Sequence, residues 1–288
     1  MNQLKTILLF GVLSALFIGI GGAFAPQYLA VFVALAAVIN LGAYFFSDRI
    51  VLAMYQAHEV SVLDAPVLHT IVSELAETAE IPMPRVYIIP ERQPNAFATG
   101  RNPKHGVVAV TQGLLDLMDP RELRGVLAHE LSHIKNRDIL VSTVAAILAS
   151  AISTVANVLS FGTLLGGRDG EDRTSLFAVL AMIIVGPLAA LLVQLAISRS
   201  RELHADQTGA QLSGDPEGLA GALLKLHGAS LLIAPEQPRP GTASLFIVNP
   251  FEGLERVSRW FSTHPSVEER VERLRALPVL REPAYAVL

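Results

Sequence analysis

The chain has 288 residues, of which 51% are hydrophobic and 17% are charged, and its formal net charge is −4. This balance, with a mean hydropathy of +0.46, excludes an ordinary soluble domain and predicts a protein that lies partly in a membrane. The complete lack of cysteine is consistent with a reducing compartment.

The chain begins with two apolar runs. Residues 4–24 contain a single charged side chain and residues 29–46 contain none, which is typical of membrane-spanning helices. A cleaved signal peptide is the alternative for the first run, but no small-x-small cleavage site followed by a polar region is present. We therefore expect residues 1–47 to form an uncleaved transmembrane hairpin that turns at Pro26-Gln27.

The next segment, residues 48–138, combines an amphipathic helix with short strands. Residues 64–80 place apolar side chains on one side of a helix, and prolines end it directly afterwards. Residues 85–90 and 106–111 are rich in Val and Ile, which predicts two strands. Between them lies a segment that we interpret as an irregular sheet edge, with a plain surface hairpin as the alternative: Asn95-Ala96-Phe97-Ala98-Thr99-Gly100.

An H-E-x-x-H pentad, His129-Glu130-Leu131-Ser132-His133, is the most informative motif in the chain. On a helix, two histidines four residues apart face the same way and can share one Zn²⁺, with Glu130 beside the metal as general base. The upstream stretch Asp119-Pro120-Arg121-Glu122 predicts the start of such a helix. This context disfavours the alternative of two ordinary surface histidines and predicts a zinc hydrolase site.

A catalytic zinc usually takes three protein ligands, so a third residue is required. The metzincin pattern would need Gly at position 136 and His at position 139, where this chain has Asn136 and Ile139, and that class is excluded. Glu202 on a second helix is the better candidate, because Asp206 lies one turn later on the same face and can orient a ligating histidine. A solvated helix surface is the alternative for both acids.

Two further residues near these ligands differ in their expected roles. His204 lies on the opposite face of the second helix and is not expected to bind the metal. Asp138, five residues after the second histidine of the pentad, is a weaker candidate for orienting a ligand, with a plain helix-surface acid as the alternative.

Residues 139–198 contain a second pair of apolar runs, 139–166 and 176–198, that are long enough to span a bilayer. Several Ser, Thr and Asn residues make the third run less apolar, so a buried or interfacial helix is its alternative. The distribution of Lys and Arg around all four runs places the catalytic segments on the positive, cytoplasmic side. The hairpin thus separates the second and third zinc ligands in sequence, and we expect its removal to disturb their register.

Residues 199–288 complete the predicted catalytic domain. Residues 215–229 and 267–277 are expected to be helical, and residues 234–243 form a Pro-rich loop. His264 lies in Ser262-Thr263-His264-Pro265, just before the last helix. A histidine presented there could donate to an oxyanion or occupy the open zinc position in a resting state, and the sequence leaves both roles open.

Several of these motifs together resemble the HtpX family of membrane-bound zinc endopeptidases, distant relatives of the CAAX prenyl protease. They are the pentad, the R-E-x-x-A-D stretch at 201–206, residues 95–100, and Thr263-His264-Pro265 with Arg270 six residues after the histidine. The order of the parts is similar along nearly the whole chain. His204 departs from the aromatic residue expected at its position, but it faces away from the metal.

The resemblance implies ATP-independent cleavage of damaged or misassembled membrane proteins in the cytoplasmic membrane. It also implies one Zn²⁺ per chain, bound by His129, His133 and Glu202, and places His264 and Arg270 in the active site with open roles. Because these ligands would also accept Co²⁺ or Mn²⁺, zinc is an expectation from chemistry and family together.

In a zinc peptidase the sheet edge would have a definite use. An extended substrate can add to such an edge as another strand, which places any backbone over the metal regardless of its side chains. The expected substrate-binding residues are therefore Asn95, Ala96, Phe97 and Ala98, and broad specificity would follow.

We therefore expect a mainly α membrane protein with a zincin-like (gluzincin) catalytic domain, a small β-sheet and about four hydrophobic transmembrane or membrane-associated helices. Its expected partners are the lipid bilayer and unfolded or membrane-protein substrates, without nucleic acid; the sequence leaves its oligomeric state open. A membrane chaperone or scaffold is the main alternative, with a structural zinc site that a permanent His264 ligand would close. A prenyl-protein processing enzyme is disfavoured, because the short chain offers little material for a large intramembrane chamber.

Overall fold

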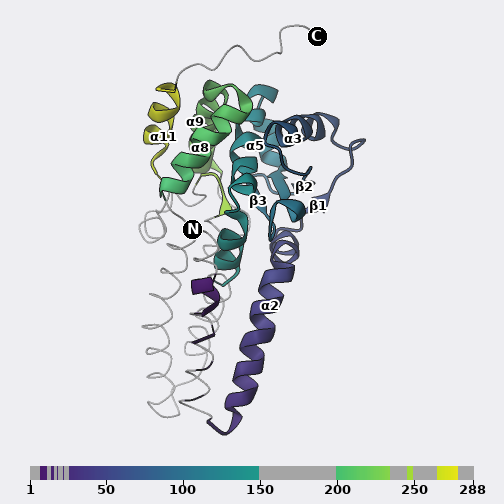
Figure 1. The fold of residues 1–288 in the computed structure, drawn as a ribbon. Helices are drawn as coiled ribbons and strands as arrows, with labels where there is room; N and C mark the ends of the chain where they lie inside the picture. Colours follow the sequence, from purple (N-terminus) through teal and green to yellow (C-terminus); the bar gives the residue numbers. More distant parts are fainter. Residues whose placement is uncertain are drawn as a thin grey trace, which may run out of the picture.

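The computed structural model describes residues 26–148, 199–233, 245–248 and 265–277, with scattered residues between 7 and 22. Most of the first apolar run and of the second hairpin (residues 149–198), with their predicted membrane spans, lies outside this part. Within the described ranges the protein is mainly helical and contains one small sheet, as expected from the sequence (Figure 1).

Helix α2 (Leu29–Met54), preceded by the short turn η1 (Pro26–Tyr28), extends away from the sheet and the C-terminal helices (Figure 1). The combined 29-residue segment has a mean hydropathy of 2.3, and 11% of its most apolar window is buried. It is the one described helix long and apolar enough to cross a membrane. The predicted run ended at residue 46, but the helix continues to Met54 because Val51 and Leu52 pack against the sheet.

The sheet has four strands in the order β1-β2-β4-β3. They are β1 (His58–Glu59), β2 (Arg85–Ile89), β3 (Ala96–Thr99) and β4 (Val107–Thr111). Strands β2 and β4 are parallel, whereas β1 pairs with β2 and β3 pairs with β4 in antiparallel fashion. Strand β3 is therefore an edge strand, and the predicted sheet edge at residues 95–100 is correct in place but more regular than expected.

Alternating side chains divide the sheet between two hydrophobic clusters. In β4, Val108 and Val110 face the larger core, which helices α3 (Pro66–Thr78) and α5 (Pro120–Lys135) share. Val107 and Ala109 face the smaller cluster, which also contains the end of α2. This is the two-residue period of a strand buried on both faces.

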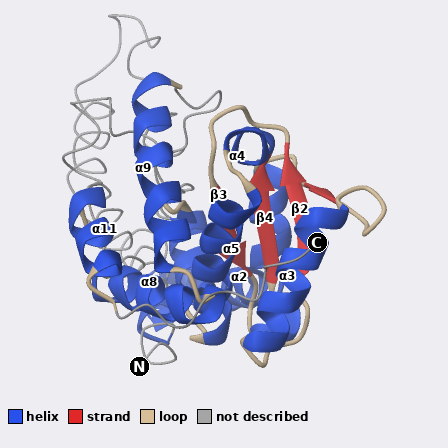
Figure 2. Ribbon diagram, turned by 90° about the horizontal axis from the view of Figure 1, so that it is seen from above, coloured by secondary structure: helices blue, strands red, loops and turns tan. Residues whose placement is uncertain are grey.

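Three C-terminal helices complete the larger core: α8 (Arg199–Ser213), α9 (Pro216–Leu232) and α11 (Val267–Arg275). Seen from above, α5 lies between the sheet and helices α9 and α11 (Figure 2). The pentad helix is thus packed on several sides, which holds its side chains in fixed positions.

The predicted helices at 64–80, 215–229 and 267–277 are confirmed with small shifts of their ends. Three elements were not predicted: the two-residue strand β1, the turn η2 (Pro103–His105) and the short helix α4 (Gln112–Leu117). The plain hairpin alternative for 85–111 is wrong, because β2 and β4 run parallel and β3 joins the sheet beyond β4. Pairings between distant strands leave little trace in local sequence patterns.

Candidate metal centre

The sequence of α5 fixes where the pentad helix begins. The Glu122 N–H donates to the Asp119 side chain (2.9 Å), and the Asp119 N–H donates to the Glu122 carboxylate (3.1 Å). With Pro120 at the start, this is the capping box that the sequence predicts. The pentad then lies in the C-terminal half of a mostly buried helix.

Helix α8 approaches the pentad helix closely through Gly209. A Cβ atom at this position would lie 2.9 Å from both the Cα and the N of His129, so only glycine fits here without displacement. Glu202 lies about two turns earlier in α8. The contact at Gly209 therefore sets the distance between the Glu202 carboxylate and the histidines.

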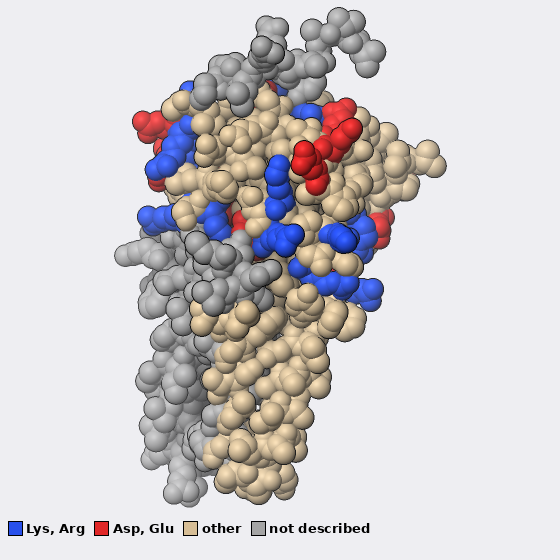
Figure 3. Space-filling model, in the orientation of Figure 1, with Lys and Arg blue, Asp and Glu red and all other residues tan. Residues whose placement is uncertain are grey.

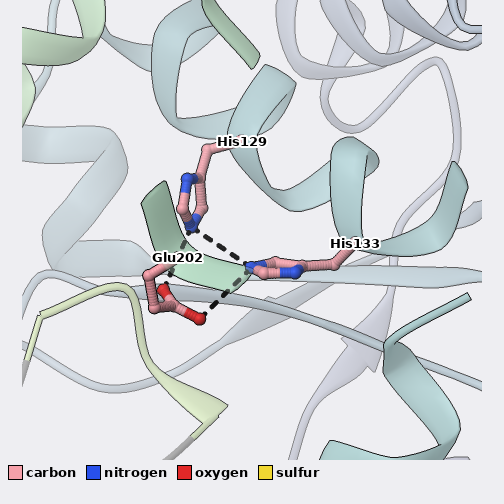
Figure 4. Close-up of side chains that lie close together, drawn as sticks. All are labelled: His129, His133 and Glu202. Carbon is pink, nitrogen blue, oxygen red and sulfur yellow. Dashed lines mark hydrogen bonds and ion pairs between the residues drawn. The ribbon is translucent and has the colours of Figure 1, made fainter. Parts of the chain in front are cut away.

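The side chains of His129, His133 and Glu202 point toward one another (Figure 4). The two histidine Nε2 atoms are 3.3 Å apart, and the Glu202 oxygens lie 3.6 Å from His129 Nε2 and 3.8 Å from His133 Nε2. Ligand atoms at about 2.0–2.1 Å from a tetrahedral zinc are separated by about 3.3 Å. Two nitrogens and a carboxylate at this spacing fit a zinc ion.

A carboxylate faces the other ring nitrogen of each histidine. The Asp206 Oδ1 lies 2.9 Å from His129 Nδ1, and the Asp138 Oδ2 lies 3.3 Å from His133 Nδ1. Such contacts fix the tautomer in which Nε2 offers its lone pair to a metal. The structure thus brings both acids to the positions expected from the sequence.

Arg270 of α11 is fully buried beside this cluster. Its Nε and Nη2 donate to the two Asp206 oxygens (2.8 and 2.7 Å). Burial alone would raise the pKa of Asp206, but Arg270 and His129 outweigh it and lower the pKa to about 2. Burial likewise lowers the pKa of His129, yet hydrogen bonds with Asp206 and Glu202 outweigh it and raise the pKa to about 9.

Glu130 is buried and lines the same small cavity as the three candidate ligands. Burial raises the pKa of its carboxyl, while the neighbouring imidazoles and a hydrogen bond from the Ala98 N–H lower it in part. The contact with Ala98 places the candidate general base directly beside strand β3.

The backbone of β3 alternates between its partner strand and its free edge. The Thr111 N–H donates to the Asn95 carbonyl (2.9 Å), and Phe97 and Thr99 continue the ladder opposite Ala109 and Val107. In an antiparallel pair the intervening residues, Ala96 and Ala98, direct their backbone groups away from the partner. Their N–H and C=O groups therefore lie on the edge that faces Glu130.

The four predicted substrate-binding residues are all buried, and their side chains have different structural roles. Phe97 packs in the smaller cluster against Tyr55 and Phe246, so its ring is a core side chain. Ala98 lines the cavity, and the Asn95 side chain accepts a hydrogen bond from the Ala96 N–H (3.1 Å). His264 lies outside the described residues.

One part of the cavity wall, residues 245–248, was not predicted from the sequence. Residues 245–248 (Leu-Phe-Ile-Val) follow the Pro-rich loop, and the first three of them line the cavity with Ile139 and Ser142. A run of four apolar residues after a Pro-rich stretch is the only local signal for this segment. Such a run is as typical of a core strand as of a site wall.

A family model described as peptidase family M48 matches residues 63–278 of the chain. The chain belongs to peptidase family M48. It is 51% identical over 281 residues to a "Protease HtpX homolog" of Syntrophobacter fumaroxidans, covering 96% of this chain and 99% of that protein. It is 48% identical over 293 residues to a "Protease HtpX homolog" of Sulfurihydrogenibium sp., covering 99% of both.

A solved structure has a similar fold. The "Crystal Structure of S. mikatae Ste24p" matches with a TM-score of 0.52 and 17% identity, covering 95% of this chain and 65% of that one. At this identity the likeness concerns the fold. The family and the relatives show that this chain is a membrane-associated metallopeptidase. Its cluster of His129, His133 and Glu202 has the residue types and spacing to bind a metal.

Proposed function

We propose that the protein is a zinc endopeptidase that cleaves misfolded or damaged membrane proteins at the cytoplasmic face of the inner membrane. The observation that carries this proposal is the spacing of His129, His133 and Glu202, which fits one zinc ion beside the carboxylate of Glu130. The same cavity adjoins the free edge of β3, where a polypeptide backbone can pair. Metal, base and backbone receptor thus share one site.

When bound there, zinc supplies a Lewis acid that polarises the scissile carbonyl and makes a water molecule more acidic. Glu130 accepts the proton of the attacking water and returns it to the amine nitrogen that leaves. Asp206 and Asp138 keep both histidines in the ligating tautomer throughout. Arg270 compensates the buried charge of Asp206.

An unfolded substrate suits the geometry of β3. Pairing through Ala96 and the Ala98 carbonyl uses backbone groups that every polypeptide carries, so it selects for extended conformation and not for particular side chains. Folded proteins commonly cover or blunt their strand edges, so they offer fewer such segments than an unfolded chain. Broad cleavage of misfolded chains is consistent with such a receptor.

The cytoplasmic orientation draws support from charges at the end of α2. Arg49 stacks on Phe46, Arg101 lies over Phe45, and Arg85 pairs with Asp48. Basic side chains are seen where α2 meets the rest of the described chain (Figure 3). Lys and Arg flanking a membrane helix favour the cytoplasmic side.

The proposal is tested with detergent-purified, zinc-loaded protein and an unfolded casein as probe. We expect the wild type to cleave casein and Glu130→Gln to bind one zinc without measurable cleavage, because the amide cannot accept the proton. Glu202→Ala should lose zinc as well as activity, and Glu77→Gln, an exposed acid on α3, should retain both.

Cleavage by Glu130→Gln at the wild-type rate would reject the assigned base. A wild type that binds zinc and cuts nothing would instead favour the closed, structural zinc site of a membrane chaperone.

A further inference from the structure

The cavity at the candidate metal centre is too small for a peptide. Its volume is about 20 Å³, enough for one water molecule or little more. An extended substrate that pairs with Ala96 and Ala98 would need room for several residues beside Glu130. Part of the wall must therefore move before a substrate reaches the site.

Most of that wall belongs to rigid elements. Ala98 is on β3, while His129, Glu130 and His133 are on α5 and Glu202 is on α8. The remaining wall includes residues 245–248, which form neither a strand nor part of a long helix. This segment, which we call the strap, is buried although it pairs with no strand of the sheet.

The strap is fastened to the substrate edge by Asn95. The Ile247 N–H donates to Asn95 Oδ1 (3.2 Å), and Asn95 Nδ2 donates to the Val248 carbonyl (3.4 Å). The same Oδ1 accepts the Ala96 N–H (3.1 Å), one of the backbone groups on the free edge of β3. One amide side chain therefore engages both the strap and a group that a substrate would use.

A second polar contact comes from Arg270, whose Nη1 donates to the Ile247 carbonyl (2.7 Å). The other guanidinium nitrogens bind Asp206, which faces His129. Release of the strap would thus free only Nη1 and leave the contacts behind the metal ligand in place. The strap can move without dismantling the metal centre.

Aromatic packing provides the apolar part of the attachment. The Phe246 ring lies edge-on to Tyr55 (5.4 Å between centroids) and to Phe97 (5.9 Å). Edge-to-face contacts of this kind stabilise packing beyond simple burial. These aromatic contacts and the three hydrogen bonds hold the strap in place. A substrate that pairs with the strand can supply hydrogen bonds in their place.

We propose that residues 245–248 cover the substrate edge of β3 in the free enzyme and move aside when an extended polypeptide pairs with Ala96 and Ala98. The inference rests on the proposed peptidase function. It adds a device that keeps the site closed to all but chains able to replace the strap's contacts. Asn95 changes partner in this step, from the strap to the substrate backbone.

The absence of cysteine from the chain makes the movement measurable. In the full-length Glu130→Gln protein, a single Val248→Cys is placed on the strap, and Val72→Cys in buried α3 serves as the matched control. The rate of modification by a maleimide is compared with and without saturating cysteine-free casein. We expect casein to increase the rate of maleimide modification of Val248→Cys about tenfold and to leave the rate for Val72→Cys unchanged, as local opening predicts.

A second variant, Phe246→Ala, loosens the strap without touching the metal ligands. We expect faster modification of Val248→Cys without casein and, with Glu130 intact, faster casein cleavage at unchanged zinc content. Slower casein cleavage by Phe246→Ala would overturn the proposal. Equal rates of Val248→Cys modification with and without casein would do the same and would make the segment a fixed part of the cavity wall. The separate cleavage assay tests the proposed peptidase function itself. That function is rejected if the zinc-loaded wild type does not cut casein.

Discussion

Asp206 and Asp138 make similar contacts with the two histidines but lie near different arginines, Arg270 and Arg201 respectively. Asp206 also carries a two-pronged contact with Arg270, and both side chains are almost completely buried. Removing one partner of a buried pair leaves an uncompensated charge in a low-dielectric interior. The two acids should therefore be separable by experiment.

We expect Asp206→Asn and Asp138→Asn each to weaken zinc binding by about 10–100-fold, because the ligating histidines lose the charged acceptor at Nδ1. Asp206→Asn should also destabilise the protein by about 3–5 kcal/mol, since Arg270 is left unpaired. Competition with a zinc chelator and thermal unfolding in detergent measure the two effects. Equal unfolding midpoints for the two variants would contradict the role given to Arg270.

At the scale of elements, glycines set the distances between helices. Gly209 allows α8 to touch the backbone of α5 at His129, and Gly125 allows α9 to touch α5 at Leu219, where a Cβ would lie 2.5 Å from the Leu219 N. By contrast, Gly228 near the end of α9 has nothing within 4 Å of an added Cβ. Identical substitutions at these sites should have opposite effects.

We expect Gly209→Ala to cost about 1–3 kcal/mol of stability by overpacking and to weaken zinc binding, because Glu202 moves with α8. Gly228→Ala should be neutral or stabilise by up to about 1 kcal/mol, since alanine favours a helix. Unfolding in detergent and chelator competition measure both variants. Unchanged zinc affinity in Gly209→Ala would show that α8 does not set the position of Glu202.

The start of α9 depends on Asp215, which accepts the Gly218 N–H (3.2 Å) and pairs with Arg121 of α5. Hydrogen bonding to Arg121 lowers the pKa of Asp215 below its usual value, and burial opposes this only in part. A lowered folded pKa stabilises the protein above the unfolded pKa of about 4 and loses that effect as the pH falls.

Asp215→Asn keeps a helix cap but loses the charge. We expect it to lower stability by no more than about 1 kcal/mol at pH 7, since Arg121 is largely exposed and water screens the pair. The difference from wild type should shrink as the pH falls below about 4. Thermal unfolding midpoints between pH 3 and 7 measure it, with the exposed Asp116→Asn as control. A difference independent of pH would contradict the ion pair.

At the scale of the whole molecule, α2 and the catalytic elements lie end to end (Figure 1). The exposed apolar surface of α2 suits a bilayer, and basic side chains lie at its C-terminal end. In the proposed orientation, η1 faces the outside and the sheet faces the cytoplasm.

Single cysteines test this orientation directly, because the chain contains none. Gln27→Cys in η1 and Lys104→Cys in η2 are both exposed positions. We expect a membrane-impermeant maleimide to label only Gln27→Cys in intact spheroplasts, and both after the membrane is permeabilised. Labelling of Lys104→Cys alone in intact spheroplasts would reverse the proposed orientation.

Local sequence signals predicted the helices best. The capping box at Asp119 and the apolar period after it fix α5, so the common face of His129 and His133 follows from helix geometry. The pairing order of the sheet was not predictable in the same way. Hydrogen bonds between β2 and β4, or between β4 and β3, join residues whose partnership depends on the global path of the chain.

The metal-binding chemistry and the helix that presents it were predictable from the amino acids, because ligand types and a spacing of four residues are local properties. Folding then establishes the distances between Glu202 and the histidines, the hydrogen bond from Ala98 to Glu130, and the contacts of Arg270 with Asp206 and the strap. These contacts join segments far apart in the chain. Their distances are set by packing, above all by the close contact of α8 with α5 at Gly209.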